Sequence, residues 1–160
     1  MAEADLSLVA DSVVSIGGVF TGDPTSSAAF TALTFVPVAG LTDIGEFGDE
    51  AEIATLKTID GARVRKKVGS KDAGTLEITV GRDPADPGQV ALRAAIGSKD
   101  AYALKIEQND APAGGTNTIH YLKVYVASAK NKLGGPDDFV TTVFTLAVDA
   151  APLTIEAAEA

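Results

Sequence analysis

Residues 75–97 read TLEITVGRDPADPGQVALRAAIG and predict a β-strand followed by a helix. Leu76, Ile78 and Val80 alternate with polar residues, and this period of two is typical of a strand with one buried face. The apolar spacing then changes to a helical one. This stretch therefore contains both kinds of element from which we expect the fold to be built.

The helix is predicted over residues 86–96 by signals at both of its ends. Asp86 is a good N-cap, and Pro87 fits the first helical position because the N–H that it lacks would have no helical partner. Gln89 falls three residues after the cap, as in a capping box, and Gly97 provides a C-terminal stop. Spacings of four residues predict an apolar stripe made of Val90, Leu92, Ala94 and Ile96. We expect this helix to be a packing element rather than a ligand site.

Further strands are predicted on either side of this stretch. Residues 102–107, 121–128 and 143–148 alternate in the same way as residues 75–80. Residues 30–36 are β-branched and aromatic and end at a proline, which suits an edge strand or a strand end. Short Gly-rich connections join these segments. The pattern predicts a mainly β fold, an antiparallel sandwich or barrel with one flanking α-helix.

The 160 residues suit one domain, which we place at residues 1–160. Residues 1–24 have no confident structural prediction, and residues 150–160 form a C-terminal tail that is expected to be mobile unless it is docked. The first ten residues, MAEADLSLVA, lack the basic and apolar regions of a signal peptide. No apolar run approaches the ~20 residues of a membrane-spanning helix, so no membrane partner is expected.

The net charge of −9 is unevenly distributed along the chain. Residues 1–56 carry nine acids and no base, residues 57–132 carry all thirteen bases with eight acids, and residues 133–160 carry five acids. This separation favours self-association in which a basic part of one copy meets an acidic part of the next. Acidic termini can equally serve solubility alone. The overall acidity argues against a surface that grips duplex DNA, which needs many cations.

Catalytic and metal-binding chemistry finds little support in the sequence. The absence of cysteine excludes disulfides, thiol nucleophiles and cysteine-ligated metals. His120, the single histidine, stands at the start of a predicted strand without a supporting motif. The acid pairs Asp49–Glu50 and Asp137–Asp138 are adjacent in sequence, and adjacent residues of a strand point to opposite faces. We therefore predict no catalytic residue, no metal site and no cofactor.

The strongest local feature is the basic stretch RVRKKVGSK at residues 63–71. It gathers five cations without an acid: Arg63, Arg65, Lys66, Lys67 and Lys71. No aromatic residue is interleaved, so stacking on single-stranded nucleic acid is not supported, and a solvated hairpin edge is the plainer interpretation. We favour contact with acidic patches of sister copies. The candidate acids are Glu46, Asp49, Glu50 and Glu52.

Residues 57–96 resemble the tail tube (major tail) proteins of long-tailed bacteriophages and gene transfer agents. Those proteins show a variable hairpin, a Lys/Gly/Asp/Gly turn, a strand and an Asp-Pro-Gly-Gln-type helix cap. The matching residues are Lys67, Gly69, Asp72, Gly74, Leu76 to Val80, and Asp86 to Ile96. Each motif alone is weak because turn residues are generic, so the order and spacing of the motifs carry the resemblance. It covers roughly residues 30–149, and residues 1–24 depart from the family pattern.

This resemblance implies a structural virion protein without catalytic residues or a cofactor. Six copies would close into a ring by joining their sheets into an inner barrel, and rings would stack into a hollow tube that conducts DNA from capsid to host. A long hairpin, here residues 53–71, would reach toward the adjacent ring. An acidic lumen would let DNA slide past without specific binding. Other tail proteins would meet the tube ends, and assembly would take place in the host cytoplasm.

Two other classes of function remain open at this stage. A β-sandwich adhesin or carbohydrate-binding domain would favour exposed aromatic residues for sugar stacking, yet the chain has no Trp and only three Tyr. A carboxylate-dependent hydrolase would need two acids that face each other in a cleft. Spatial pairing of that kind can be judged only from the structure.

Overall fold

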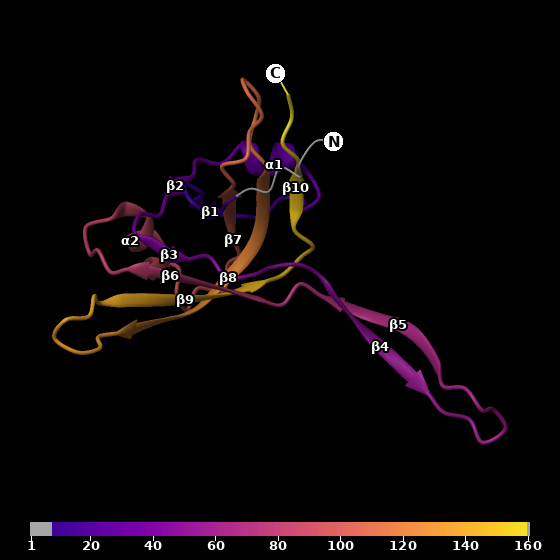
Figure 1. The fold of residues 1–160 in the computed structure, drawn as a ribbon. Coiled ribbons are helices and arrows are strands. Elements are labelled where there is room, and N and C mark those ends of the chain that lie inside the picture. Colours follow the sequence, from indigo (N-terminus) through magenta and orange to yellow (C-terminus); the bar gives the residue numbers. More distant parts are fainter. Residues whose placement is uncertain (1–7, 160) are drawn as a thin grey trace, which may run out of the picture.

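The computed structural model describes residues 8–159, a mainly β structure with two short helices in that range (Figure 1). The helices are α1 (Ser27–Thr31) and α2 (Pro87–Ala94). The strands are β1 (Val13–Val19), β2 (Val36–Pro37), β3 (Leu41–Asp43), β4 (Glu50–Leu56), β5 (Arg65–Asp72), β6 (Thr75–Gly81), β7 (Tyr102–Glu107), β8 (Ile119–Lys132), β9 (Thr141–Val148) and β10 (Leu153–Ile155). The strands predicted at residues 75–80, 102–107, 121–128 and 143–148 are confirmed as β6, β7, part of β8 and β9.

One continuous antiparallel sheet folds over to enclose the main core. Its strand order is β2-β1-β7-β8-β9-β6-β3, with β10 paired to the start of β8. β8 belongs to both halves of this sheet. Its residues 119–124 pair with β7 in the first half, which also holds β1 and β2, and its residues 124–132 pair with β9 in the second half, which also holds β6 and β3. A register shift between Val126 and Ser128 marks a bulge where β8 leaves the first half for the second. Figure 1 shows the two halves running in different directions.

The core lies between the two halves and is built by the predicted alternation. Leu76, Ile78 and Val80 of β6 are fully buried, as are Leu104 of β7 and Phe144 of β9. The residues between them point away from the core, so each strand contributes one apolar face. Packing of these faces provides the main hydrophobic stabilisation of the fold.

Helix α2 begins as predicted but buries a different face. Asp86 caps it, since its Oδ2 accepts a hydrogen bond from the Gln89 backbone N–H at 3.0 Å. Leu92 is fully buried, whereas Val90 is 46% exposed, Ile96 36% exposed and Ala94 also exposed, so the predicted stripe is wrong at those three positions. The buried positions of the helix are Gly88, Gln89 and Leu92.

Glycine 88 explains why the helix turns this face inward. A Cβ atom at Gly88 would lie 2.3 Å from the carbonyl oxygen of Pro37 in β2, so only glycine allows the close approach. The first turn of α2 therefore rests directly on the backbone at β2, and the side chain at the next position is buried with it. Sequence spacing alone did not reveal this contact.

Gln89 is a buried polar residue, and both polar atoms of its side-chain amide form hydrogen bonds with backbone groups. Its Nε2 donates to the carbonyls of Ala39 at 3.0 Å and Gly81 at 2.9 Å, and its Oε1 accepts from the Asp83 N–H at 3.0 Å. The side chain is fully buried. Gln89 thus joins α2 to the β2–β3 connection and to the end of β6.

We expect Gln89→Leu to lower the free energy of unfolding by about 2–4 kcal/mol, because two carbonyls and one N–H lose the partner that a fully buried side chain gave them in part-buried hydrogen bonds. Urea unfolding followed by circular dichroism measures this change. Gln108→Leu is the matched control, since Gln108 is only half-buried and its side chain makes no hydrogen bond within residues 8–159. Equal effects of the two substitutions would contradict the bridging role.

The segment predicted as a strand at residues 30–36 is mostly something else. Phe30 lies in α1, and only Val36 and Pro37 pair, as β2, with β1. The helical turn lets the Phe30 ring stack on Phe20 at 4.3 Å and on Tyr121 at 5.0 Å between ring centroids. These aromatic rings form a second, smaller core on the other side of the first half of the sheet. The packing of the buried Phe30 ring thus outweighs the β propensity of the neighbouring residues, and the segment forms a helical turn.

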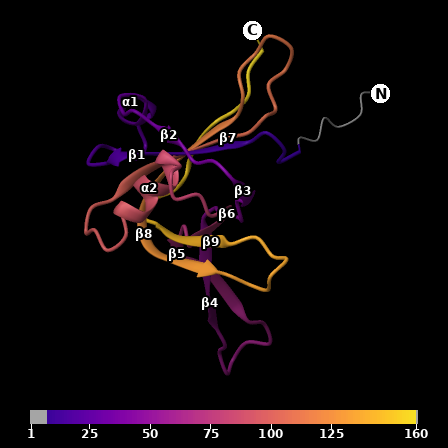
Figure 2. The ribbon, with the colours of Figure 1, turned by 90° about the vertical axis from the view of Figure 1, so that its left-hand side faces the viewer.

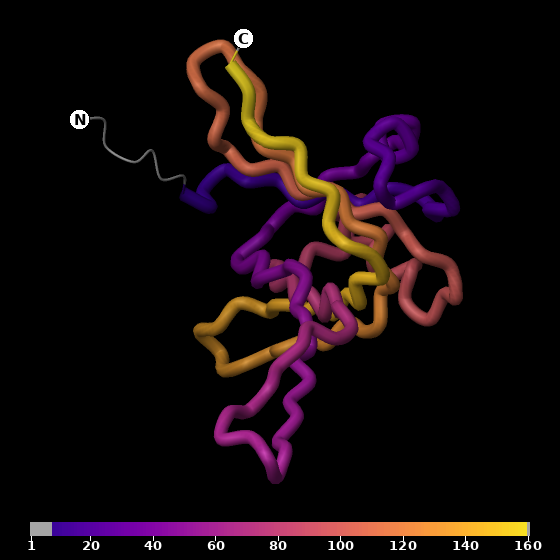
Figure 3. Tube along the Cα trace, turned by 90° about the vertical axis from the view of Figure 1, so that its right-hand side faces the viewer, coloured from indigo at the N-terminus to yellow at the C-terminus, as the bar shows by residue number. Residues whose placement is uncertain are grey.

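The C-terminal segment is docked against the sheet. β10 pairs with the start of β8, and Ala158 forms a β-bridge with Thr116. Figure 3 shows the segment running beside the loop of residues 108–118. Thr118 Oγ1 also accepts the Ala157 N–H at 3.1 Å while it donates to Asp110 Oδ2 at 2.6 Å. The hydrogen bonds from Thr118 lower the pKa of the Asp110 carboxyl. Within residues 1–24, the structure places β1, and residues 1–7 lie outside the described range.

Candidate assembly surfaces

The hairpin β4–β5 projects from the body of the molecule (Figures 1 and 2). Every residue from 52 to 72 is exposed, so the hairpin has no side that packs on the rest of the described chain. Its large apolar side chains are therefore open to solvent: Ile53, Leu56, Ile59, Val64 and Val68. Exposed apolar residues gathered on one element commonly mark an interface with another protein.

The two faces of this hairpin carry different side chains. Arg65 lies opposite Leu56, and Lys67 lies opposite Ala54, so these cations share one face. Lys66 lies opposite Thr55 on the other face. Arg63 precedes β5 and belongs to the loop at the tip of the hairpin.

The candidate acids divide between two places. Glu50 and Glu52 belong to β4 itself, near the base of the hairpin, and Glu46 and Asp49 lie in the loop that leads into it. Within residues 8–159 the ion pairs are Lys105–Glu107 at 3.5 Å and Lys123–Asp149 at 3.0 Å. The basic and acidic groups of the hairpin therefore stay unpaired inside the described part of one copy. Their pairing between copies stays a prediction.

A second projection is the turn between β8 and β9, residues 133–140. All eight positions are exposed, and Phe139 is 90% and Leu133 65% accessible. Asp138 holds the turn, because its Oδ2 accepts the Gly135 N–H at 2.8 Å. This bond gives Asp138 a structural part in the turn, and the two acids of the Asp137–Asp138 pair stay in a solvated loop.

The second half of the sheet has one polar face and two open edges. Beyond Val124 no described residue pairs with β8 on the side opposite β9, so residues 126–132 form an open edge. At the other end, β3 pairs with β6 at only two positions, Leu41 with Val80 and Asp43 with Thr79. Unpaired edges normally invite pairing with another chain.

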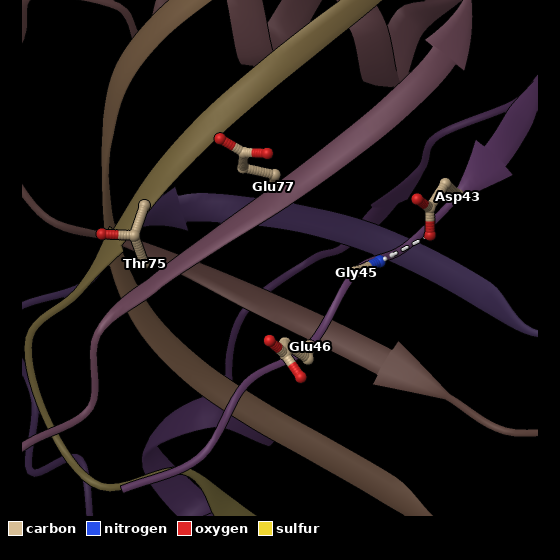
Figure 4. Close-up of a pocket in the computed structure, with 5 residues that line it drawn as sticks. All are labelled: Asp43, Gly45, Glu46, Thr75 and Glu77. Atoms are coloured by element: carbon tan, nitrogen blue, oxygen red, sulfur yellow. Dashed lines mark hydrogen bonds between the residues drawn. The ribbon is translucent and has the colours of Figure 1, made fainter. Parts of the chain in front are cut away.

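The polar face of this half is rich in hydroxyl groups. Cross-strand pairing puts Thr75, Thr79, Thr141 and Thr145 on the face opposite the core. Near the β3 edge this face borders an open hollow of about 570 Å³ lined by Asp43, Gly45, Glu46, Thr75 and Glu77. Figure 4 shows the three carboxylates around this hollow, with Asp43 accepting the Gly45 N–H at 2.9 Å.

His120 is used for packing within the described chain. Its Nδ1 lies 2.9 Å from Thr154 Oγ1 of β10, and its ring meets the edge of Phe47 at 4.9 Å between centroids. Burial lowers the pKa of the imidazole, which keeps it neutral near pH 7. The contacts join the C-terminal strand, β8 and the loop that carries Glu46 and Asp49.

The described residues offer neither a clustered set of metal ligands nor a membrane-spanning helix. Across residues 8–159 there is no cluster of three or more His, Asp or Glu side chains suited to a metal ion. In the same range no helix has the length and apolarity needed to cross a bilayer. The main features of the described surface are the open strand edges, the exposed apolar residues of the two projecting turns and the unpaired charges.

No family model and no curated protein matches this chain. Its fold, however, matches solved structures over nearly its whole length. A chain in the 6-fold symmetrised cryo-EM structure of the anti-feeding prophage baseplate gives a TM-score of 0.70 at 12% identity, covering 98% of both chains. The SPP1 tail tube gives 0.62 at 14%, covering 91% of this chain and 77% of that one. A chain in the cryo-EM structure of the PVC sheath/tube terminator, from an extracellular contractile injection system, gives 0.63 at 15%, covering 97% and 99%.

These similarities establish the architecture. The chain has the fold shared by a phage tail tube protein and by tube and baseplate components of contractile injection systems. This is the fold that the resemblance of residues 57–96 to tail tube proteins implied. At 12–15% identity the likeness concerns the fold, and the assembly of this chain is a separate question.

Proposed function

We propose that this chain is the repeating subunit of a tail tube, in which six copies close into a ring and rings stack into a hollow conduit. The observation that carries the proposal is a tail-tube fold over nearly the full chain. The particle would be a bacteriophage, a gene transfer agent or a related phage-derived assembly. Other tail proteins would bind the tube ends, and the subunit would assemble in the host cytoplasm.

Ring closure is supported by the open edges of the second half of the sheet. The edge at residues 126–132 of β8 and the edge at β3 lie at opposite ends of four strands. Two different edges on one subunit suit head-to-tail joints, which close into a ring when the rotation between copies fits. Closure would remove edges that invite aggregation in a lone sheet.

Stacking of rings is supported by the hairpin β4–β5. It projects away from the sheet, exposes apolar residues on a monomer and carries unpaired charges of both signs. Contact with an adjacent ring would cover Leu56 and Val68 and bring Arg63, Arg65 and Lys67 near acids of another copy. The acids Glu46, Asp49, Glu50 and Glu52 remain our candidates.

We propose that the assembled tube conducts DNA passively and catalyses no reaction. The solved structures with this fold are parts of tails, tubes and baseplates. On the polar face of the second half, four threonines stand beside charges of both signs that nearly balance, which supports passage without tight binding. A lumen lined by this face would carry charges of both signs rather than acids alone, because Lys130 and Lys132 of β8 share the face with Glu77 of β6 and Asp43 of β3.

A terminal ring is the second candidate, favoured by the similarity to a tube terminator and a baseplate chain. A terminator would form a ring yet stop there, whereas a tube subunit would continue to add rings. Rings and tubes can be distinguished by size alone.

The experiment is native mass spectrometry and negative-stain electron microscopy of the purified chain over a range of concentrations. We expect hexamers that extend into hollow tubes as the concentration rises. Single rings that never stack would favour the terminal-ring role. A monomer at every concentration, with no rings or tubes on the grid, would refute both.

A further inference from the structure

The polar face of the second half is charge-polarised from one edge to the other. Lys130 of β8 lies opposite Val143 of β9, which lies opposite Thr79 of β6, which lies opposite Asp43 of β3. Directly opposed residues share a face, so one row across four strands begins with a cation and ends with an anion. Neither end residue has an ion pair within residues 8–159.

The rows beside this one reinforce the same polarity. Lys132 lies opposite Thr141 on the lysine edge. Glu77 lies opposite Thr145, two residues along β6 from Thr79, and Glu46 borders the same hollow as Glu77 and Asp43 (Figure 4). The β8 edge thus carries two lysines, and the β3 edge carries three carboxylates, all on exposed residues.

We infer that Lys130 and Lys132 of one copy pair with Asp43, Glu46 and Glu77 of the next copy, and that this joint fixes the head-to-tail sense of the ring. The inference rests on the proposed function and names the residues of its lateral contact. The partner is a second copy of this chain, because the open β8 edge offers a strand and the β3 edge offers complementary charge. The hollow beside Asp43 gives the lysine side chains space to enter.

Charge of this kind selects orientation more than it adds affinity. A joint between two β8 edges would bring four lysines together, and a joint between two β3 edges would bring six carboxylates together. Like charges across an interface cost several kcal/mol and suppress such pairings. An exposed ion pair itself contributes only about 0–1 kcal/mol, so apolar and backbone contacts must supply the rest of the joint.

In a closed barrel, each lysine of one copy can pair with more than one carboxylate of the next copy. Closing a sheet shifts neighbouring strands along each other, so Lys130 need not meet Asp43 of its own row. Three carboxylates spaced along the edge provide a partner at several offsets. The joint therefore depends on the sign of each edge rather than on one particular pair.

Two variants test this joint. The first, Lys130→Glu with Lys132→Glu, makes both edges acidic. The second, Glu46→Lys with Glu77→Lys, makes both edges basic on balance, and it leaves Asp43 in place because Asp43 accepts the Gly45 N–H. Circular dichroism and thermal melting verify that each variant folds. Lys130→Arg with Lys132→Arg is the matched control and should form rings like the wild type.

We expect each charge-reversed variant alone to lose ring formation, and an equimolar mixture to recover rings in which the two variants alternate. Native mass spectrometry detects the alternation, because rings of six then hold three copies of each variant. Rings formed by either variant alone, or no rings in the mixture of two folded variants, would overturn the inference while wild-type rings uphold the proposed function. A wild-type chain that never forms rings would instead refute the proposed function itself.

Discussion

Replacing Leu92 by aspartate is expected to lower the free energy of unfolding by about 3–5 kcal/mol, the largest stability change we predict for a single substitution. Leu92 is fully buried where α2 covers the edge of the main core. The substitution removes an apolar side chain from that core. It also places a carboxyl group among the apolar side chains of that core, and a buried carboxylate without a partner is strongly unfavourable.

Val90→Asp on the same helix is the control for this prediction. Val90 is 46% exposed, so an aspartate there stays in water and keeps the helix intact. We expect its effect to stay within about 0.5–1 kcal/mol. Urea denaturation of the two variants, monitored by circular dichroism, gives the comparison. If Leu92→Asp left the unfolding midpoint unchanged, the inward face of α2 would be assigned incorrectly.

Reversing the charges at the tip of the β4–β5 hairpin should abolish tube growth and leave the fold unchanged. The variant is Arg63→Glu with Arg65→Glu and Lys67→Glu. All three residues are exposed and make no ion pair within the described chain, so circular dichroism and melting should barely move. Between rings, the new carboxylates would face acids that the cations were expected to pair with, and the repulsion recurs in every subunit.

Sedimentation and electron microscopy at several salt concentrations measure this effect. Wild-type tubes should shorten at high salt, since exposed charges are screened over about 8 Å at physiological ionic strength and over less when salt is added. Arg63→Lys, Arg65→Lys and Lys67→Arg together keep the charge and should still form tubes. Full-length tubes from the reversed variant would remove the hairpin tip from the contact between rings. Rings without tubes would separate this axial contact from the lateral joint at β8 and β3.

The local sequence pattern predicted much of this fold, because strands and helix caps are indicated by residues that lie close together in the sequence. The alternation at Leu76, Ile78 and Val80 corresponds directly to burial in β6, and Asp86 caps α2 as its sequence context suggests. Hairpin β4–β5 was implied by the resemblance of residues 57–96 to tail tube proteins, and its cations are exposed. These features depend on neighbours in sequence, so one sequence suffices to predict them.

Features that depend on contacts across the chain were missed. Gln89 was interpreted as part of a capping box, yet its side chain bonds to Ala39, fifty positions away. Phe30 was assigned to a strand, and its stacking on Tyr121 placed it in a helix instead. The candidate lateral joint is the clearest case. Lys130 and Asp43 lie at opposite ends of one row, and only the pairing of β8 with β9, β9 with β6 and β6 with β3 aligns them.

The threonines on the polar face of the second half bear on how freely a polymer could move through the proposed tube. Thr75, Thr79, Thr141 and Thr145 each end in one hydroxyl and one methyl group, carry no charge and have a stiff χ1. A chain that slides over them exchanges one weak contact for the next, because each threonine offers one hydroxyl and no charge. In the proposed ring, six such faces would give a smooth, low-friction wall, and the speed of delivery would be limited by the driving force rather than by adhesion to the protein.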